Sequence, residues 1–225
     1  MPGAQSSTEA VLFDWCGTLV DYPTKEDRFG QVLERLGRPT NQVEALAEAY
    51  RTAEQHPAAI EADKRCDLSA EDHAHTKRTI CHIAGIDTEL GDAIEASYSD
   101  LDTYPTHPEA VEVITRLDDQ GIKIAIVSDF HVDLRPHFDA LGILDRITGF
   151  AISYEVGVTK PHPRMFQAAL DFVSVPPERC LMVGDNPHPD GGAAALGIPT
   201  LILPVRRKPR PPLLERVEAL VLDNP

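Results

Sequence analysis

Short apolar runs alternate with longer amphipathic segments along most of this sequence. Five runs, at residues 10–14, 122–129, 149–153, 180–185 and 200–203, are mainly apolar, and several of them end in Asp or Ser. Runs of this length and composition are typical of parallel strands that are covered on both faces. The segments between them carry apolar residues at three- and four-residue spacing, as the crossover helices of a parallel sheet do; examples are 107–120, 163–173 and 191–196. The pattern predicts an α/β fold with a doubly wound, Rossmann-like parallel sheet.

The alternation is broken once, between residues 22 and 103. This stretch contains only helical patterns, rich in Ala, Glu and Asp, with Pro or Gly near the helix ends. We interpret it as a helical cap domain inserted into an α/β core domain of residues 1–21 and 104–225. The junctions are expected near Tyr22-Pro23 and Tyr104-Pro105, because proline disfavours helix in the residue before it.

The charge balance narrows the choice of partners. The formal net charge of the 225-residue chain is -15, which would repel a phosphate backbone, so nucleic-acid binding is not expected. Small molecules are the expected substrates, and the oligomeric state stays open. One basic cluster is interleaved with prolines and is expected to be a solvated segment; it comprises Arg206, Arg207, Lys208 and Arg210.

The cysteines and the apolar windows bear on the compartment. The four cysteines lie far apart with no C-x-x-C pair, which favours reduced thiols over a disulfide framework or a zinc site. No window approaches ~18 apolar residues, and the first residues lack a signal-like apolar run. We therefore expect a cytoplasmic protein that does not enter a membrane.

Candidate chemistry gathers where the predicted strands end. In an open α/β sheet, ligands bind outside the carboxyl ends of the strands, which is where Asp14, Ser128, Asp129 and Asp185 fall. Asp14 ends a buried strand and is followed by a Gly-Thr turn, an arrangement suited to a carboxylate nucleophile. A strand-terminal Asp that only caps a turn is as common, so this signal depends on the other motifs.

Three further elements supply what a carboxylate nucleophile needs. Ser128 can donate a hydrogen bond to a bound anion, and Lys160 can neutralise developing negative charge. Asp185 and Asp190, in Gly184-Asp-Asn-Pro-His-Pro-Asp190, bring paired carboxylates to the fourth strand. Carboxylate oxygens are the ligands by which proteins hold Mg²⁺, so Asp14 with Asp185 predicts a magnesium site.

In this order, and with a helical insertion after the first, the four motifs resemble those of the haloacid dehalogenase superfamily of phosphatases and related hydrolases. They read here as DWCGT with Asp14, then Ser128, then Lys160, then GDNPHPD with Asp185. The resemblance implies a Mg²⁺-dependent hydrolase in which Asp14 attacks a small organic phosphate and forms an aspartyl-phosphate.

The same resemblance extends the set of site residues. Asp14, Asp185 and the backbone carbonyl of Cys16 are the expected Mg²⁺ ligands, with Asp190 bracing the metal shell. Thr18, Ser128, Asp129 and Lys160 are the expected substrate contacts. Replacement of Lys160 is expected to lower turnover with little loss of fold, because its role is to offset charge rather than to fill the core.

One position departs from the family pattern. Similar phosphatases carry a second Asp two residues after the nucleophile, as the general acid and base, and here that residue is Cys16. General acid–base catalysis contributes about 10²–10⁴-fold, or roughly 3–5.5 kcal/mol of barrier. Cys16 is either a small buried thiol or a catalytic group, and we favour the buried thiol.

The departure keeps three other functions open. Trp15 resembles the first motif of phosphonoacetaldehyde hydrolases, which use a cap lysine as a Schiff base; Lys25, Lys64 and Lys77 are available, but each is expected to be a solvated surface lysine. Asp185 disfavours a metal-free dehalogenase, because such an enzyme would have no obvious use for a metal-binding acid there. The intact set of four motifs disfavours a binding module without catalysis, because such a module needs no nucleophile.

The histidines add little at this stage. His131 and His162 flank the predicted site, where contact with substrate and a capping or surface role are both open. His73 and His75 have the alternate spacing of a solvated segment and receive no role.

Overall fold

The strands form one parallel sheet. The computed structural model describes residues 8–203 and 213–222, so the basic cluster at 206–210 lies outside the described residues. The sheet has the order β3-β2-β1-β4-β5. Its strands are β1 (Ala10–Phe13), β2 (Lys123–Ser128), β3 (Gly149–Ile152), β4 (Cys180–Gly184) and β5 (Thr200–Ile202). Each of the five predicted runs holds one strand, and the predicted α/β class with a parallel, Rossmann-like sheet is confirmed.

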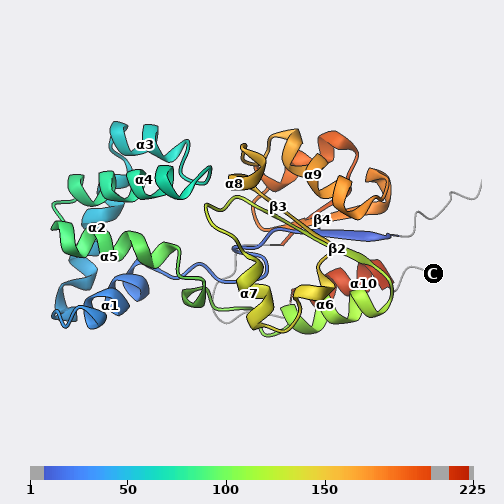
Figure 1. Ribbon diagram of the computed structural model, residues 1–225, viewed down its shortest axis with the longest axis horizontal. Helices are drawn as coiled ribbons and strands as arrows, with labels where there is room; N and C mark the ends of the chain where they lie inside the picture. Colours follow the sequence, from blue (N-terminus) through green and yellow to red (C-terminus); the bar gives the residue numbers. More distant parts are fainter. Residues whose placement is uncertain (1–7, 204–212, 223–225) are drawn as a thin grey trace, which may run out of the picture. The chain divides into compact units, whose positions relative to one another are not determined.

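Helices cover both faces of the sheet (Figure 1). They are α6 (Ala110–Asp119), α7 (Arg135–Ala140), α8 (Ser153–Val156), α9 (Pro163–Val173) and α10 (Glu215–Leu222), with 3₁₀ turns η3 (Leu144–Arg146), η4 (Pro177–Arg179) and η5 (Asp190–Leu196). On one face, α9 buries Phe166 and Leu170 in the same core cluster as Leu12 of β1. Successive strand residues point to opposite faces of the sheet. Because helices cover both faces, every residue of β1 is buried, and its sequence is a continuous apolar run.

The segment predicted as a helix at 191–196 is a 3₁₀ turn instead. Two adjacent glycines, Gly191 and Gly192, weaken α-helix formation there. A Cβ at Gly192 would lie 2.6 Å from the Cβ of Pro161, so this position needs a glycine to let the two loops approach.

The described residues divide into two compact units. One contains the sheet and comprises the residues up to Asp21, then 106–129, and those from Asp133 onward. The other comprises Tyr22–Pro105 together with Phe130–Val132. We call the second the helical unit. The short segment Phe130–Val132, which begins two residues after the end of β2, belongs to it although it lies far from the other residues in sequence.

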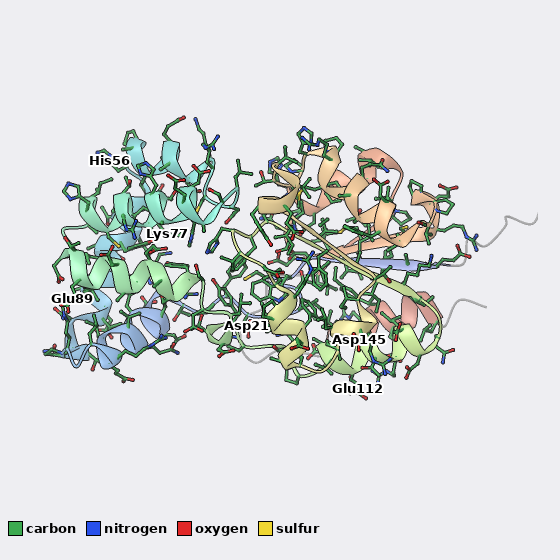
Figure 2. All side chains as sticks on the ribbon, viewed as in Figure 1. Asp21, His56, Lys77, Glu89, Glu112 and Asp145 are labelled. Carbon is green, nitrogen blue, oxygen red and sulfur yellow. The ribbon has the colours of Figure 1, made fainter. Side chains whose placement is uncertain are left out.

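The helical unit is built from capped amphipathic helices. They are α1 (Lys25–Arg35), α2 (Val43–Glu54), α3 (Pro57–Asp63), α4 (Ala70–Ile83) and α5 (Thr88–Tyr98), with 3₁₀ turns η1 (Thr40–Gln42) and η2 (Leu101–Thr103). Side chains of the residues before four of these helices accept backbone N–H groups, as N-caps do; they are Thr24, His56 (labelled in Figure 2), Ser69 and Asp87.

The apolar faces of these helices share one core. Phe29 and Leu33 of α1, Tyr50 of α2, Ile80 of α4 and Ile94 of α5 are all buried in it. Among the described residues, no helix is both long enough and apolar enough to cross a membrane.

Candidate active site

A tight turn after β1 fixes the predicted nucleophile. Asp14 is 5% exposed, and its backbone N–H donates to the Val183 carbonyl at 2.9 Å. The next residues fold back: the N–H groups of Leu19 and Val20 both donate to the Trp15 carbonyl. The turn thereby brings Thr18 beneath Asp14, and the Thr18 hydroxyl donates to Asp14 Oδ2 at 3.0 Å.

Gly17 makes this turn possible in two ways. Its φ of 90° is a conformation that residues with a Cβ rarely adopt. A Cβ at this position would also lie 2.2 Å from Asp185 Oδ2. The turn after β1 and the carboxylate after β4 are therefore packed directly against each other.

Lys160 joins the predicted groups. Its Nζ donates to Asp14 Oδ1 and to Asp190 Oδ1, each at 2.7 Å, and its side chain is 3% exposed. Its backbone N–H donates to Asp129 Oδ1 at 2.9 Å. The loop after α8 thus places one ammonium between two buried carboxylates, one in the turn after β1 and the other at the start of η5.

Asp190 contacts Lys160 directly, whereas the sequence suggested only that it braces the metal shell. It is 1% exposed, and its Oδ2 accepts the Asn186 N–H at 3.0 Å. A Cβ at Gly184 would lie 2.1 Å from the same oxygen, so the glycine at the end of β4 admits this carboxylate. The motif at residues 184–190 predicted a second carboxylate after β4, but the contact of that carboxylate with Lys160 is visible only in the structure.

Negative charge exceeds positive charge in this cluster. Asp14, Asp185 and Asp190 can each offer a carboxylate oxygen, and these atoms lie within 4.8 Å of one another. Burial raises the pKa of Asp14 to about 7; Lys160 opposes the rise, while Asp190 and Asp185 add to it. Burial, with repulsion from Asp190, also raises the pKa of Asp185. One ammonium does not balance three carboxylates, so the site has the charge to accept a divalent cation.

Two other predicted residues are placed by the backbone. Ser128 is the last residue of β2 and is 1% exposed, beside Asp129 at the carboxyl end of the sheet. Cys16 is buried inside the Asp14 turn, where its backbone forms an isolated bridge with Val20.

Among the histidines, the structure corrects one expectation and explains another. His73 is 2% exposed and not solvated as its spacing suggested, because α4 turns it inward; His75, two residues later, is exposed. His162 Nδ1 accepts the Arg164 N–H at 3.2 Å, so His162 caps α9. His131 belongs to the helical unit.

The three candidate Schiff-base lysines differ in their surroundings. Lys25 pairs with Glu54 at 3.1 Å, and Lys64 is exposed and pairs with Glu61. Lys77 is only partly exposed, with its Nζ 4.7 Å from the centre of the Tyr98 ring. The expectation of a solvated lysine is therefore wrong for Lys77.

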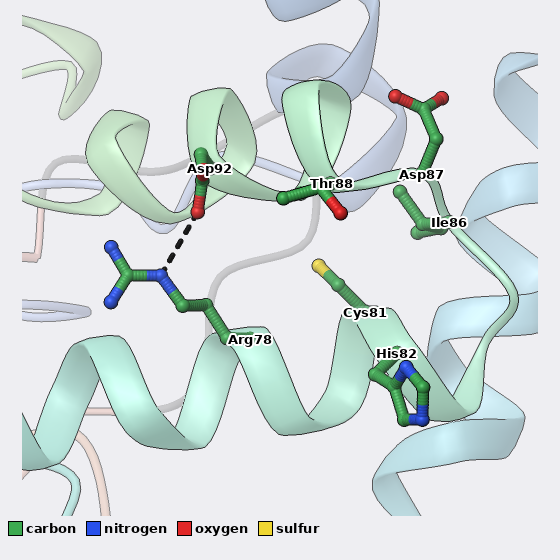
Figure 3. A pocket seen from close by; sticks show the side chains of 8 residues that line it. Arg78, Cys81, His82, Ile86, Asp87, Thr88 and Asp92 are labelled. Atoms are coloured by element: carbon green, nitrogen blue, oxygen red, sulfur yellow. Dashed lines mark hydrogen bonds and ion pairs between the residues drawn. The ribbon is translucent and has the colours of Figure 1, made fainter.

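A separate hollow lies between α4 and α5 (Figure 3). The Arg78 side chain crosses it to Asp92, with Nε donating to Oδ1 at 2.9 Å. Cys81 points from α4 toward α5 in Figure 3, and burial raises the pKa of its thiol to about 12. Such a thiol is unreactive at neutral pH, and the hollow has no catalytic set comparable to the Asp14 cluster.

Comparisons with known proteins agree on one family. The family model for haloacid dehalogenase-like hydrolase matches residues 8–197. Phosphoserine phosphatase of Thermus thermophilus is 36% identical over 103 residues, 45% of this chain and 41% of that protein, so the match spans less than half of that relative. Ribulose-1,5-bisphosphate 5-phosphatase of Halopiger xanaduensis is 30% identical over 205 residues, 86% of this chain and 83% of that protein. The structure of L-2-haloacid dehalogenase from Xanthobacter autotrophicus shares the fold, with a TM-score of 0.62 at 21% identity over 97% of this chain and 84% of that one.

Proposed function

Since the chain belongs to the haloacid dehalogenase-like hydrolase family, we propose that it is a Mg²⁺-dependent phosphatase of small organic phosphates. The observation that carries the proposal is the bridge from Lys160 to Asp14 and Asp190 beside Asp185. It combines an oriented nucleophile, a cation to offset charge and a set of hard ligands in one cluster. Residues 22–103 are proposed to form the cap domain.

In the proposed reaction, the Asp14 carboxylate attacks the phosphorus atom. A bond forms from an Asp14 oxygen to phosphorus while the bond from phosphorus to the ester oxygen breaks, and the electron pair leaves with that oxygen. Water then attacks the phosphorus of the aspartyl-phosphate, the bond from phosphorus to the Asp14 oxygen breaks, and inorganic phosphate leaves as the carboxylate is regenerated. Thr18 and Lys160 each hold one Asp14 oxygen, which limits rotation of the carboxylate before attack.

The surrounding residues offset charge at the phosphoryl group. The Lys160 ammonium stabilises the negative charge that develops on phosphoryl oxygens, and the Ser128 hydroxyl is proposed to donate to them. Asp129 holds the Lys160 backbone in position.

Mg²⁺ fits the donor set of this site. Three carboxylates face one another against a single ammonium, which is a costly arrangement unless a cation balances it. Asp14, Asp185 and the Cys16 carbonyl are the proposed ligands, braced by Asp190. When bound, Mg²⁺ supplies electrostatic stabilisation of phosphoryl charge.

The phosphonatase alternative is weakened by the lysines of the helical unit. A Schiff-base lysine must be neutral to attack a carbonyl, which requires a lowered pKa. Burial lowers the pKa of Lys77, but Cys66, Tyr98 and nearby carboxylates outweigh it and leave the pKa raised. Lys25 pairs with Glu54, and Lys64 pairs with Glu61.

The dehalogenase and binding-module alternatives do not account for the acid cluster. Metal-free dehalogenation has no obvious use for Asp185 beside the nucleophile, and this second carboxylate is costly to keep near Asp14. A binding module needs no nucleophile held by both Thr18 and Lys160.

Turnover of a panel of phosphate esters tests the proposal. We expect hydrolysis with Mg²⁺, none in EDTA, and loss of at least ~10³-fold in kcat for Asp14→Asn, because the nucleophile is removed. Asp171→Asn, at an exposed carboxylate bonded to Gln167, is the matched control and should turn over normally. Turnover by Asp14→Asn equal to that of the wild type would exclude the mechanism.

A second experiment addresses Cys16. If the leaving oxygen lacks a proton donor, Cys16→Asp should raise turnover of an unactivated alkyl phosphate by as much as ~10²-fold and leave an activated ester little changed. No gain on either ester would count against ordinary ester hydrolysis and favour a leaving group that needs no proton.

A further inference from the structure

Lys160, which carries the cation of the proposed site, lies in the loop between α8 and α9. The His162 N–H donates to the Thr159 carbonyl at 3.0 Å, which closes a turn around Lys160 and Pro161. Groups on loops are in general less precisely held than groups on strands. The position of the ammonium therefore depends on what ties this turn to the sheet.

The two hydrogen bonds of the Lys160 ammonium are with acids of the site itself. Nζ donates to Asp14 and to Asp190, each at 2.7 Å. In the proposed reaction Asp14 becomes an acyl phosphate, and its carboxyl group then carries no negative charge of its own. The attraction between Asp14 and the ammonium weakens at that stage, although the ammonium must still stabilise phosphoryl charge in the second step. A tether that uses no reacting group would keep Lys160 in place through both steps.

Asp129 supplies such a tether. Its Oδ1 accepts the backbone N–H of Lys160 at 2.9 Å. Asp129 directly follows Ser128, the last residue of β2, and β2 is an inner strand that pairs with both β1 and β3. Ser128 itself is paired with Ile152 of β3, so the strand is held up to its last residue. The backbone of a loop residue is thereby fixed to the end of an inner strand.

A second contact limits the movement of the same turn. A Cβ at Gly192 of η5 would lie 2.6 Å from the Cβ of Pro161, the residue after Lys160. Asp190, which accepts from the ammonium, is the first residue of η5. The turn therefore contacts both η5 and the end of β2, and Asp129 is its hydrogen-bonded anchor at β2.

The contact between Asp129 and Lys160 needs an acceptor oxygen rather than a charge. Burial raises the pKa of Asp129, the charge and the backbone N–H of Lys160 oppose the rise, and Asp190 adds to it. A carboxylate, a carboxylic acid and a carboxamide each have an oxygen that accepts an N–H. The backbone of Lys160 can therefore be held at this position by Asp in either protonation state, or by Asn.

We propose that Asp129 is a positioning residue for phosphoryl transfer: it ties Lys160 to the end of β2, so that the Ser128 hydroxyl and the Lys160 ammonium meet the phosphoryl oxygens as one rigid pair. Asp129 acts through Lys160 and does not contact the substrate, which differs from the substrate contact that the sequence suggested. The inference rests on the proposed function, which assigns Ser128 and Lys160 their roles. It adds that two groups from distant parts of the chain depend on one carboxyl group for their spacing.

Steady-state hydrolysis of phosphate esters with Mg²⁺ tests the inference. Asp129→Ala removes the acceptor and should lower kcat by ~10–100-fold, as expected for a catalytic group that shifts by about 1 Å, while KM changes by less than ~3-fold. Asp129→Asn keeps an acceptor oxygen and should retain both kcat and its pH profile. Asp133→Ala is the matched control, because Asp133 Oδ1 accepts the Arg135 N–H at 3.0 Å in the same unit; it should turn over normally.

A double-mutant cycle shows whether Asp129 acts through Lys160. In a Lys160→Met background, Asp129→Ala should lower kcat by no more than ~2-fold, because the group that it positions is gone. If Lys160→Met does not fold, the comparison of Asp129→Ala with Asp129→Asn decides. A full further loss of kcat in the cycle, a rise in KM with kcat intact, or an Asn variant as impaired as the Ala variant overturns the inference.

Unfolding in urea separates this inference from the proposed function. If no ester is hydrolysed by the wild type, the phosphatase proposal fails, and circular dichroism in EDTA then tests the tether alone. The decrease in urea midpoint caused by Lys160→Met should be at most about half as large in an Asp129→Ala background as in an Asp133→Ala background. A released Lys160 contributes less through its contacts with Asp14 and Asp190. If Lys160→Met is unfolded at pH 7.5, the cycle is measured at pH 5, where acids that lose their ammonium take up protons. Equal decreases in the two backgrounds overturn the inference.

Discussion

Replacing Lys160 by methionine should cost this protein stability as well as turnover. The substitution keeps an unbranched side chain of similar length but removes the ammonium that contacts Asp14 and Asp190 at 2.7 Å each. Both carboxylates then remain buried without that partner. The sequence had suggested little loss of fold for a substitution here, and the burial of all three groups changes that expectation.

The magnitude follows from the geometry. At an effective dielectric constant of about 20, a unit-charge attraction at 2.7 Å is worth roughly 6 kcal/mol before desolvation. Desolvation of the ions offsets much of this, and measured losses on breaking a buried pair are about 3–5 kcal/mol. Because Lys160 has two such contacts, we expect the upper part of that range in EDTA at pH 7.5, with a ~10²–10³-fold loss of kcat when Mg²⁺ is present.

Urea unfolding followed by circular dichroism measures the loss in free energy of unfolding. The deficit should shrink at pH 5, because losing the ammonium raises the pKa of Asp14 further and the folded variant is then stabilised by taking up a proton. Asp190→Asn added to Lys160→Met should restore part of the stability, since one unpaired charge disappears.

Lys123→Met is the matched control. Its Nζ donates only to the Val173 carbonyl among the contacts found in the described residues, so it should cost under ~1.5 kcal/mol. A loss for Lys160→Met no larger than for this control, or one that is the same at pH 5 and pH 7.5, would refute the reasoning.

Three further predictions concern the same cluster. Gly17→Ala should lower turnover and cost over ~1 kcal/mol of stability by urea unfolding, because of its φ of 90° and the 2.2 Å approach to Asp185; Gly157→Ala, at φ 78° with open space around it, should show the smaller cost of backbone strain alone. Asp185→Ala should abolish Mg²⁺ binding in calorimetry, and unchanged affinity would exclude it as a ligand. The free energy of unfolding in EDTA should fall by ~3 kcal/mol from pH 4 to pH 7 relative to Asp14→Asn, because the folded state keeps the Asp14 proton up to a pKa of about 7 and the unfolded chain releases it near 3.9; parallel pH profiles would contradict this.

The positions of the strands could be predicted from short apolar runs in the sequence. Strands buried on both faces need uninterrupted apolar residues, so their positions appear directly in the sequence, as at β1 and β2. The carboxyl ends of such strands lie on one edge of the sheet, so Asp14 and Asp185 were expected in one site before the close approach of Asp185 to Gly17 was visible. The 3₁₀ turn η5 was predicted as a helix because its apolar residues have helical spacing.

The contacts of Arg28, Lys77 and His73 with the Tyr98 ring could not be predicted from local sequence patterns. Arg28, His73 and Lys77 come from two helices far apart in sequence, and polar residues carry no periodic signal of burial. His73 looked solvated because only packing shows which turn of α4 faces inward. Whether a lysine is paired depends on side chains from other helices, so a cation without a partner can be recognised only in three dimensions.

The segment Phe130–Val132 matters for anyone who transplants the helical unit to another scaffold. That unit is assembled from two pieces of chain, and the smaller piece contributes Phe130, whose ring packs on Tyr104, and His131, which stacks on His73. A graft of residues 22–105 alone would leave the faces of Tyr104 and His73 uncovered. A chimera that also exchanges residues 130–132 should therefore fold better than one cut at the obvious boundaries, and recombination breakpoints are best placed outside both pieces.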